Sequence, residues 1–404
     1  MTSGRARRLA PLVLATMATQ ASIVVLAPLI VAIGEDLGAS VSAVGLARSV
    51  LAGTAFAGSL AIGPLIDRIG VRPLIVRGAA LGLIGAAATA LSPSLPFFYA
   101  AHVITGLGVA CLLSAGFAGV AAYFDGGEMT WAMGYVVAGQ SLAWIFGNPV
   151  VGTLAHEVSW RLAYAVPATV CLIALAAGLA SRPAAASLSA SDESDSIRDG
   201  LRAVVHDRSA RRWSIAELVG YTAWAAELTY AGAFYIHEYD VSEATVGFLL
   251  AIGSLVFLAT SLSTARLTAA LPRRRLIVVC AFGMGAMLVP LLNWAPSVVV
   301  TLGMFCVMGV FAGVRSTGSS ALGLEQLPER PGAMMGARTA SAQLGYMLGA
   351  AGGGLVLALW GFGTLGFVLF GGMAASAFLL AGVRDPWADG LSGVANRSAQ
   401  PFPD

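Results

Sequence analysis

The chain has 404 residues, of which 57% are hydrophobic and only 11% are charged, roughly half the charged share of an average soluble domain. This composition disfavours a water-soluble globular protein. All 23 residues counted as Lys+Arg are arginine, so the chain offers no lysine for a P-loop or for a Schiff base. The four cysteines stand singly without metal-ligand spacing, so we expect no metal site and no cofactor. The net charge of +2 is too small to indicate binding to nucleic acid.

Apolar stretches long enough to cross a bilayer as helices recur along nearly the whole chain. A membrane β-barrel would show short alternating segments instead, so helices are favoured. The sequence predicts an all-α integral membrane protein with twelve transmembrane helices, at 9–33, 41–63, 74–92, 96–123, 132–155, 161–181, 213–236, 244–265, 275–294, 297–323, 336–360 and 364–383.

The arginines predict the orientation. Most of them lie in segments that the twelve spans place on one side, namely 1–8 (three), 64–73 with Arg77 (three), 182–212 (six), 266–275 (four), 324–338 (two) and the tail after 383 (two). The opposite loops carry mostly acidic residues. Because loops rich in arginine stay in the cytoplasm, we expect a multi-pass protein of the plasma (inner) membrane with both termini cytoplasmic.

A long polar segment and an internal repeat divide the chain. Shifting the sequence by about 202 residues aligns 59–76 with 261–278, and the same shift aligns the glycines of the fifth and eleventh spans. We predict four parts: an N-terminal six-helix bundle (1–181), a linker (182–212), a C-terminal six-helix bundle (213–383) and a cytoplasmic tail (384–404). The linker is either a short interfacial helix, with Ile197 and Leu201 on one face, or a solvated run of charges. Two such halves with a site between them are typical of an alternating-access transporter.

The most specific motif follows the second span and reads GPLIDRIGVRP (63–73). It resembles the loop signature of the major facilitator superfamily, and the resemblance extends over nearly the whole chain. The resemblance implies the two-bundle major facilitator fold and a conformational latch that is made in the outward-facing state. The latch would consist of Gly63, Asp67, Arg68, Gly70 and Arg72. A loop that only fixes the orientation is the alternative, and the second half has Ala269 at the equivalent of Asp67, so any latch is one-sided.

Two further motifs resemble signatures of the same superfamily. HVITGLGVA (102–110) is similar to its arginine-glycine signature for proton coupling, with His102 at the place of the arginine. A histidine there either titrates or is a satisfied polar residue of the bundle. GQSLAWIFGNPVVG (139–152) resembles the Gly-Pro signature of drug–proton antiporters, which implies a hinge in the fifth helix and favours export. The hinge residues would be Gly139, Gly147, Pro149 and Gly152.

Two charged residues lie deep in the predicted spans. Glu227 is fourteen residues into the seventh span, at ~21 Å, and Arg315 is nine residues from the cytoplasmic end of the tenth span, at ~14 Å. Helical side chains tilt toward the N-terminus of their helix, so the two lean toward each other. We predict that they form the working charge pair of a central cavity. A static ion pair is the alternative, and Glu217 is the other acid that can pair with the arginine.

Gln20 and Gln343 are polar groups at depth and are further candidates for lining this cavity, as is Arg48. Tyr230 either lines the cavity or is an aromatic residue of the core. The chain has no HExxH, GxSxG or clustered acids in its spans, so we expect no enzyme. The preferred hypothesis is proton-coupled efflux of a small organic molecule by a monomer in the lipid bilayer. The alternatives are a proton-coupled importer, in which Arg48 and Arg315 bind an anionic substrate, and a transporter-like membrane sensor. The sequence leaves the substrate, the direction and the coupling ion open.

Overall fold

The computed structural model describes residues 3–124, 126–181, 197–270, 272–294 and 296–385, and every element in these ranges is a helix. The helices are α1 (Ser3–Val24), α2 (Leu26–Leu37), α3 (Val41–Ile69), α4 (Val71–Ala90), α5 (Leu95–Tyr123), α6 (Gly126–Glu157), α7 (Trp160–Ala163), α8 (Ala165–Ala180), α9 (Ile197–His206), α10 (Arg208–Tyr239), α11 (Glu243–Ala270), α12 (Arg273–Asn293), α13 (Val298–Leu324) and α14 (Pro331–Ala381).

The described helices account for the twelve predicted spans. Helices α1 and α2 form one span with a 41° bend, and α7 continues into α8 as another. Helix α14 consists of two limbs that meet at Gly361, whose φ of 77° is a conformation that residues with a side chain rarely adopt. By length and composition, eight described helices can cross a bilayer, or nine with the bent pair. The second limb of α14 and the more polar α6 and α10 complete the twelve.

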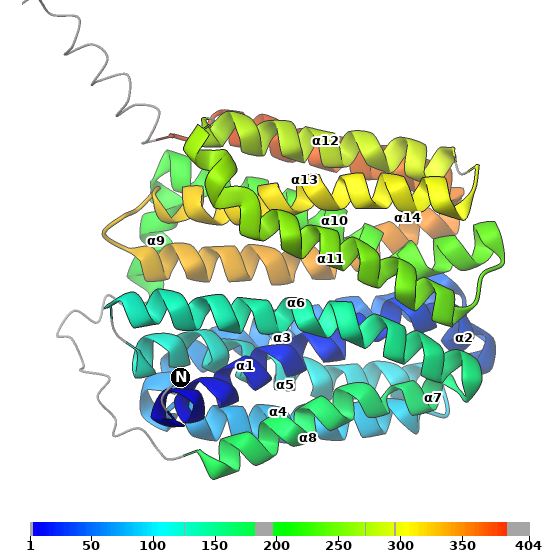
Figure 1. The fold of residues 1–404 in the computed structure, drawn as a ribbon, viewed down its shortest axis with the longest axis horizontal. Coiled ribbons are helices and arrows are strands. Elements are labelled where there is room, and N and C mark those ends of the chain that lie inside the picture. The colour runs from blue at the N-terminus through cyan, green and yellow to red at the C-terminus, as the bar shows by residue number, and fades with distance from the viewer. Residues whose placement is uncertain (1–2, 125, 182–196, 271, 295, 386–404) are drawn as a thin grey trace, which may run out of the picture.

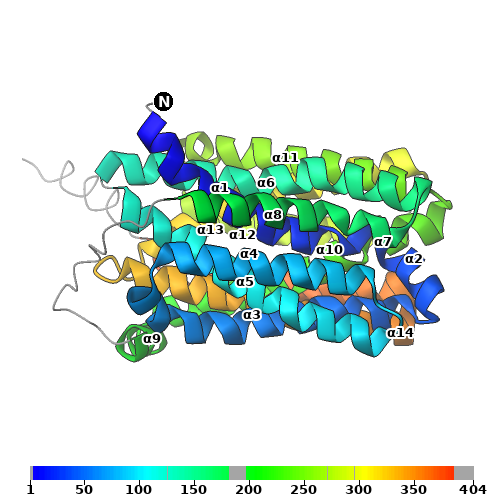
Figure 2. The same ribbon diagram turned by 90° about the horizontal axis from the view of Figure 1, so that it is seen from below.

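The spans form two layers. In Figure 1, α1 to α8 make the lower layer, and α10 to α14 make the upper one. Each layer has its own apolar core: Leu12, Leu74 and Cys171 belong to the first, and Met284 and Phe305 belong to the second. Figure 2 shows the long helices of both layers running along a common axis. The molecule therefore consists of two helical bundles packed side by side.

Helix α9 lies at one end of the bundles, which we call the linker end; the opposite end is the far end (Figures 1 and 2). Helix α9 occupies part of the predicted linker, whose residues 182–196 lie outside the described ranges. Val204 is buried against the second bundle, whereas Leu201 and Val205 are exposed. An apolar pair on the outer face is what an interfacial helix requires, and its place on a membrane surface stays a prediction.

Local sequence signals set several helix boundaries. Asp207 precedes α10 and its carboxylate accepts hydrogen bonds from the backbone N–H groups of Ser209 and Ala210, at 2.9 and 2.7 Å. Ser297 caps α13 in the same way. Gly38 ends α2 with a φ of 61°, which satisfies carbonyl groups of its last turn. These caps fix where the spans begin and end, and hence the height of each side chain along the axis.

The two layers are joined at the far end. An apolar cluster there combines Val44, Phe98 and Trp160 of the first layer with Tyr230 and Ala233 of the second. Figure 1 shows α11 close to α6 at the far end and separated from it toward the linker end. The contacts between the layers thus concentrate on one side, and the helices diverge on the other.

Candidate functional site

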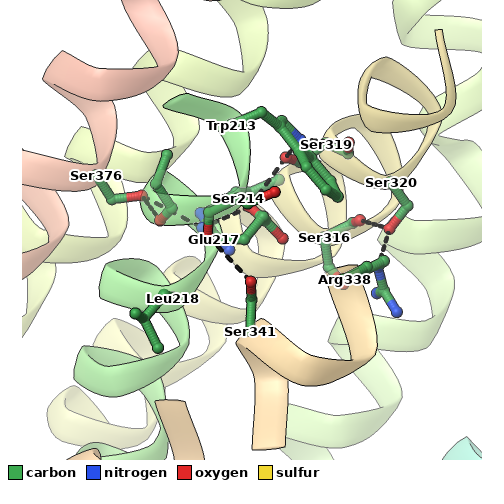
Figure 3. Close-up of polar contacts among 12 residues, drawn as sticks. Trp213, Ser214, Glu217, Leu218, Ser316, Ser319, Ser320, Arg338, Ser341 and Ser376 are labelled. Atoms are coloured by element: carbon green, nitrogen blue, oxygen red, sulfur yellow. Dashed lines mark hydrogen bonds and ion pairs between the residues drawn. The ribbon is translucent and has the colours of Figure 1, made fainter. Parts of the chain in front are cut away.

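A buried ion pair joins α10 and α13 of the second bundle, and Figure 3 shows its acid, Glu217, with Ser319 and Ser376 nearby. Arg315 Nη2 lies 2.9 Å from Glu217 Oε1, and the two side chains are 1% and 0% exposed. Ser319 donates a hydrogen bond to the same carboxylate oxygen at 2.9 Å, and Arg315 Nη2 donates to Ser376 Oγ at 3.3 Å. Trp213 Nε1 donates to Ser319 at 3.0 Å. Helices α10, α13 and α14 therefore meet through one hydrogen-bonded network.

The predicted pair of Glu227 and Arg315 is wrong, and the alternative with Glu217 is correct. The sequence predicts that the seventh span begins at residue 213, which is five residues too late. Helix α10 begins at Arg208, so Glu217 stands nine residues from its start, at ~14 Å. Arg315 stands nine residues from the end of α13 and has the same height. Glu227 lies nineteen residues along α10, at ~29 Å, which is beyond the reach of the arginine.

Glu227 instead faces a small apolar cavity in the far half of the second bundle. Tyr230, Phe234 and Tyr235, at helical spacing from the glutamate, line this cavity together with residues of α12, α13 and α14. Glu227 is 4% exposed, and its Oε2 atom and the hydroxyl of Tyr235 have no hydrogen-bond partner. No salt bridge found among the described residues includes Glu227. It is a buried carboxyl without a cation.

Four residues form a second polar group where the two bundles meet, which we call the arginine–tyrosine cluster: Arg48, Tyr221, Arg338 and Tyr346. The guanidinium carbon of Arg48 lies 5.2 Å from the centre of the Tyr346 ring, which connects α3 of the first bundle to α14 of the second. The rings of Tyr346 and Tyr221 are 5.7 Å apart, and the guanidinium carbon of Arg338 lies 5.9 Å from the Tyr221 ring. The two tyrosine rings are therefore neighbours, and each of them has one of the two guanidinium groups beside it.

Three other residues that the sequence predicts for the cavity, His102, Gln20 and Gln343, lie outside the ion pair and the arginine–tyrosine cluster. His102 is buried, its Nδ1 is 2.8 Å from the Phe98 carbonyl oxygen, and it lies within electrostatic range of Arg48. Gln20 accepts a hydrogen bond from Trp144 at 2.9 Å. Gln343 is buried and its Oε1 has no partner.

Tyr230 has a structural role at the far end. Its hydroxyl donates to the Ala350 carbonyl at 2.7 Å, and its ring packs against Gly45 of the first bundle. A ring held in this way closes the space between the bundles, so we interpret Tyr230 as a packing residue in this conformation.

The predicted latch can be described only in part, because residues 63–68 lie within α3 but their side chains are outside the described positions. Gly70 has a φ of 83°, which is suited to the turn between α3 and α4. Arg72 donates to the carbonyl groups of Gly178 and Leu179, at 3.1 and 2.9 Å. Arg72 therefore caps the end of α8, where a cation interacts favourably with the last carbonyl groups of the helix.

The predicted hinge residues lie on α6 and contact two different helices. Pro149 is inside the helix. Gly139 and Gly147 face Val13 and Val24 of the first span, and Gly152 faces the Glu243 backbone of α11 in the other bundle. The absence of a side chain at Gly152 allows α6 and α11 to approach closely. A role in bending stays a prediction.

Sequence reasoning missed Arg338 as a site residue, because it was counted with the arginines of a cytoplasmic loop. It stands two residues inside the predicted span 336–360, and that position is the signal that would have found it. Ser319 and Ser376, which hydrogen-bond to the ion pair, gave no signal, since serines are frequent in packed membrane helices.

The comparison with protein families decides the identity of the fold. A sequence profile of the Major Facilitator Superfamily matches residues 12–242 and 213–396, and the two matches together cover nearly the whole chain. This chain belongs to the Major Facilitator Superfamily. It is therefore a multi-pass membrane transporter, as the motifs and the two six-helix bundles predicted.

Among curated proteins, the chain is similar to the multidrug resistance protein MdtM of Salmonella typhimurium strain LT2, with 28% identity over 156 residues, 39% of this chain and 38% of that protein. MdtM of Escherichia coli strain K12 is 27% identical over 172 residues, 43% of this chain and 42% of that protein. The matched part thus spans about two-fifths of these relatives.

Solved structures show the same fold. A D-xylose-proton symporter superposes with a TM-score of 0.78 at 14% identity, over 93% of this chain and 97% of the symporter. A mutant of the nucleoside transporter NupG superposes with a TM-score of 0.77 at 14% identity, over 93% of this chain and 98% of that one. At such identities the likeness is one of fold alone.

Proposed function

We propose that this member of the Major Facilitator Superfamily is a secondary active transporter that exports a small organic molecule in exchange for protons. It does so by alternating access between bundles 1–181 and 213–383, as a monomer in the inner membrane with both termini in the cytoplasm. The observation that carries the proposal is the uneven contact between the bundles, which are joined at the far end and diverge at the linker end. With the arginine-rich loops inside, this conformation faces the cytoplasm.

The proposed proton site is Glu227. A carboxylate in a membrane span needs a cation, hydrogen bonds or a proton to offset the loss of water. Glu227 is buried beside an apolar cavity with an unpartnered Oε2 atom, and the described residues that line this cavity include no cation. A proton is the partner that this site can accept, and rocking of the bundles then exposes the carboxyl to one side or the other.

The direction of transport rests on the similarity to MdtM and on the Gly-Pro motif of α6. The second candidate is a proton-coupled importer of an organic anion. It is favoured by Arg48, a buried arginine for which the described residues contain no carboxylate partner. A transporter-like sensor has no such supporting observation.

Reconstituted protein tests the proposal. Proteoliposomes with an imposed pH gradient and no ATP should accumulate an aromatic probe, such as ethidium or 2-naphthoate, against its gradient. Dissipating the proton gradient should abolish this accumulation. Accumulation that survives the loss of both the proton and the sodium gradients contradicts proton coupling, and the sign of the required gradient separates export from import.

Glu227→Gln tests the proton site. Because the amide keeps the size of the side chain and removes its proton exchange, we expect normal insertion and thermal stability with at least a tenfold loss of uphill transport. Downhill exchange should survive. Glu238→Gln on the same helix, where the side chain is exposed, is the matched control and should transport like the unchanged protein. Uphill transport with an unchanged pH dependence in Glu227→Gln removes this residue from the mechanism.

A further inference from the structure

The meeting face of the two bundles carries more cationic than anionic groups. Arg48, Arg315 and Arg338 lie there or directly beside it, and Glu217 is the carboxylate that the described residues place among them. Glu217 is already engaged by Arg315 and by the hydroxyl of Ser319. The region therefore has an excess of positive charge that the described side chains do not neutralise.

For Arg48, none of the ion pairs found among the described residues supplies a carboxylate partner. It is 5% exposed, and Nη1 donates to the carbonyl of Ile23 at 3.0 Å. Its Nε is buried without a hydrogen-bond partner. The guanidinium lies beside the half-buried ring of Tyr346. A buried arginine whose described contacts are a carbonyl and an aromatic ring is unfavourable in a membrane protein unless an anion binds to it.

Arg338 places a second positive charge nearer the linker end. Its Nε donates to the hydroxyl of Ser320 at 2.7 Å, which is a neutral acceptor. Its side chain is partly exposed. The carboxylate of Glu217 is within electrostatic range, but it is shared with Arg315. Arg338 can thus attract an anion that approaches from the side on which the bundles diverge.

Aromatic rings lie between these two arginines. The rings of Tyr221 and Tyr346 meet edge to face, and Tyr221 stacks on Trp224 with an interplanar angle of 17°. Trp224 in turn contacts Phe257 of α11, with ring centres 5.4 Å apart. Aromatic residues of this kind pack favourably against a flat apolar group, and the arginines beside them are suited to a charged one.

We propose that the arginine–tyrosine cluster is the substrate site and that it selects organic anions: the carboxylate or a similar group binds Arg48, and a planar aromatic part packs on Tyr346, Tyr221 and Trp224. Arg338 adds long-range attraction and does not bind the anion directly in this conformation. The proposal rests on the proposed transport function, whose substrate class it specifies. A cationic substrate would meet uncompensated positive charge at this place.

Three ligands of nearly equal shape test the selectivity in the purified full chain: 2-naphthoate, neutral 2-naphthamide and cationic 2-naphthylmethylammonium. Their binding is measured by isothermal titration calorimetry at 0.15 M salt. We expect the naphthoate to bind about 10- to 100-fold more tightly than the amide, because a charge-assisted hydrogen bond contributes that factor. Equal or tighter binding of the amide or the ammonium compound overturns the proposal, as does the lack of millimolar or tighter binding by all three.

Variants locate the site. Arg48→Gln should weaken naphthoate binding about 10- to 100-fold and leave amide binding unchanged, whereas Arg48→Lys should retain part of the preference for the anion. Arg338→Gln should weaken naphthoate binding only about fivefold. Arg275→Gln, an exposed arginine at the start of α12, is the control and should change nothing. Naphthoate binding that is unaffected by Arg48→Gln overturns the assignment, and retained amide binding shows that the variant is folded.

The binding and transport experiments can refute the anion site and the transport function independently of each other. If naphthoate binds through Arg48 but neither naphthoate nor ethidium accumulates in proteoliposomes, the transport proposal fails and the anion site stands. If ethidium accumulates with the proton gradient while naphthoate does not bind, transport stands and the anion site is wrong.

Discussion

Removing the acid of the buried ion pair should destabilise the second bundle more than any surface change. Glu217→Gln keeps the shape of the side chain but leaves the guanidinium of Arg315, which is 1% exposed, without its counter-charge. Breaking a buried pair by removing one partner costs about 3–5 kcal/mol, since the remaining charge is not compensated. Ser376 and the new amide can still accept hydrogen bonds, which favours the lower end of that range.

Thermal unfolding of the purified protein in detergent measures this cost. For a bundle of this size, 1 kcal/mol shifts the Tm by about 2–4 °C, so Glu217→Gln should lower it by roughly 6–20 °C. The double variant Glu217→Gln with Arg315→Gln removes the stranded charge as well, and it should be more stable than Glu217→Gln alone. Glu128→Gln breaks the exposed pair with Arg5, and it serves as the control with an expected change within about 1 kcal/mol.

A Tm of Glu217→Gln within 2 °C of the unchanged protein would refute this reasoning, because it would mean that water reaches the guanidinium. A double variant that is less stable than Glu217→Gln would also contradict it, since the hydrogen bonds of the arginine would then matter more than its charge.

The remaining predictions concern the change between conformations. Gly152→Val should hinder closure of the far end, because a side chain at this position collides with the Glu243 backbone. Accessibility labelling should then show a larger share of outward-facing molecules. Gly134→Val on the same helix, where a Cβ meets no atom, is the control and should leave this share unchanged. Unchanged labelling in Gly152→Val would contradict the tight contact between α6 and α11. Asp67→Ala should reduce turnover much more than expression, since a helix-end charge contributes only ~1 kcal/mol to stability but biases one conformation. The same inward/outward balance in this variant and in the unchanged protein would exclude the latch.

The sequence alone determined the fold class and the number and order of the spans. Each of these depends on a local property: twenty or so apolar residues are sufficient to define a span, because lipid cannot hydrogen-bond to an exposed backbone. The break at Gly361 and the caps at Asp207 and Gly38 also reflect residues whose preferences act within one turn. The loop motif at 63–73 was sufficient to name the family, which the profile match then showed.

Only the tertiary structure decided which charges meet. Each residue along a helix adds 1.5 Å of height and 100° of rotation, so an error of five residues at the start of α10 moved the predicted partner of Arg315 from Glu217 to Glu227. The closeness of Arg48 to Tyr346 depends on how α3 and α14 of different bundles pack, and no local pattern encodes that. Bilayer crossing is a property of single segments, whereas the site depends on height, rotation and packing of several helices at once, and these quantities are fixed only when the bundles assemble.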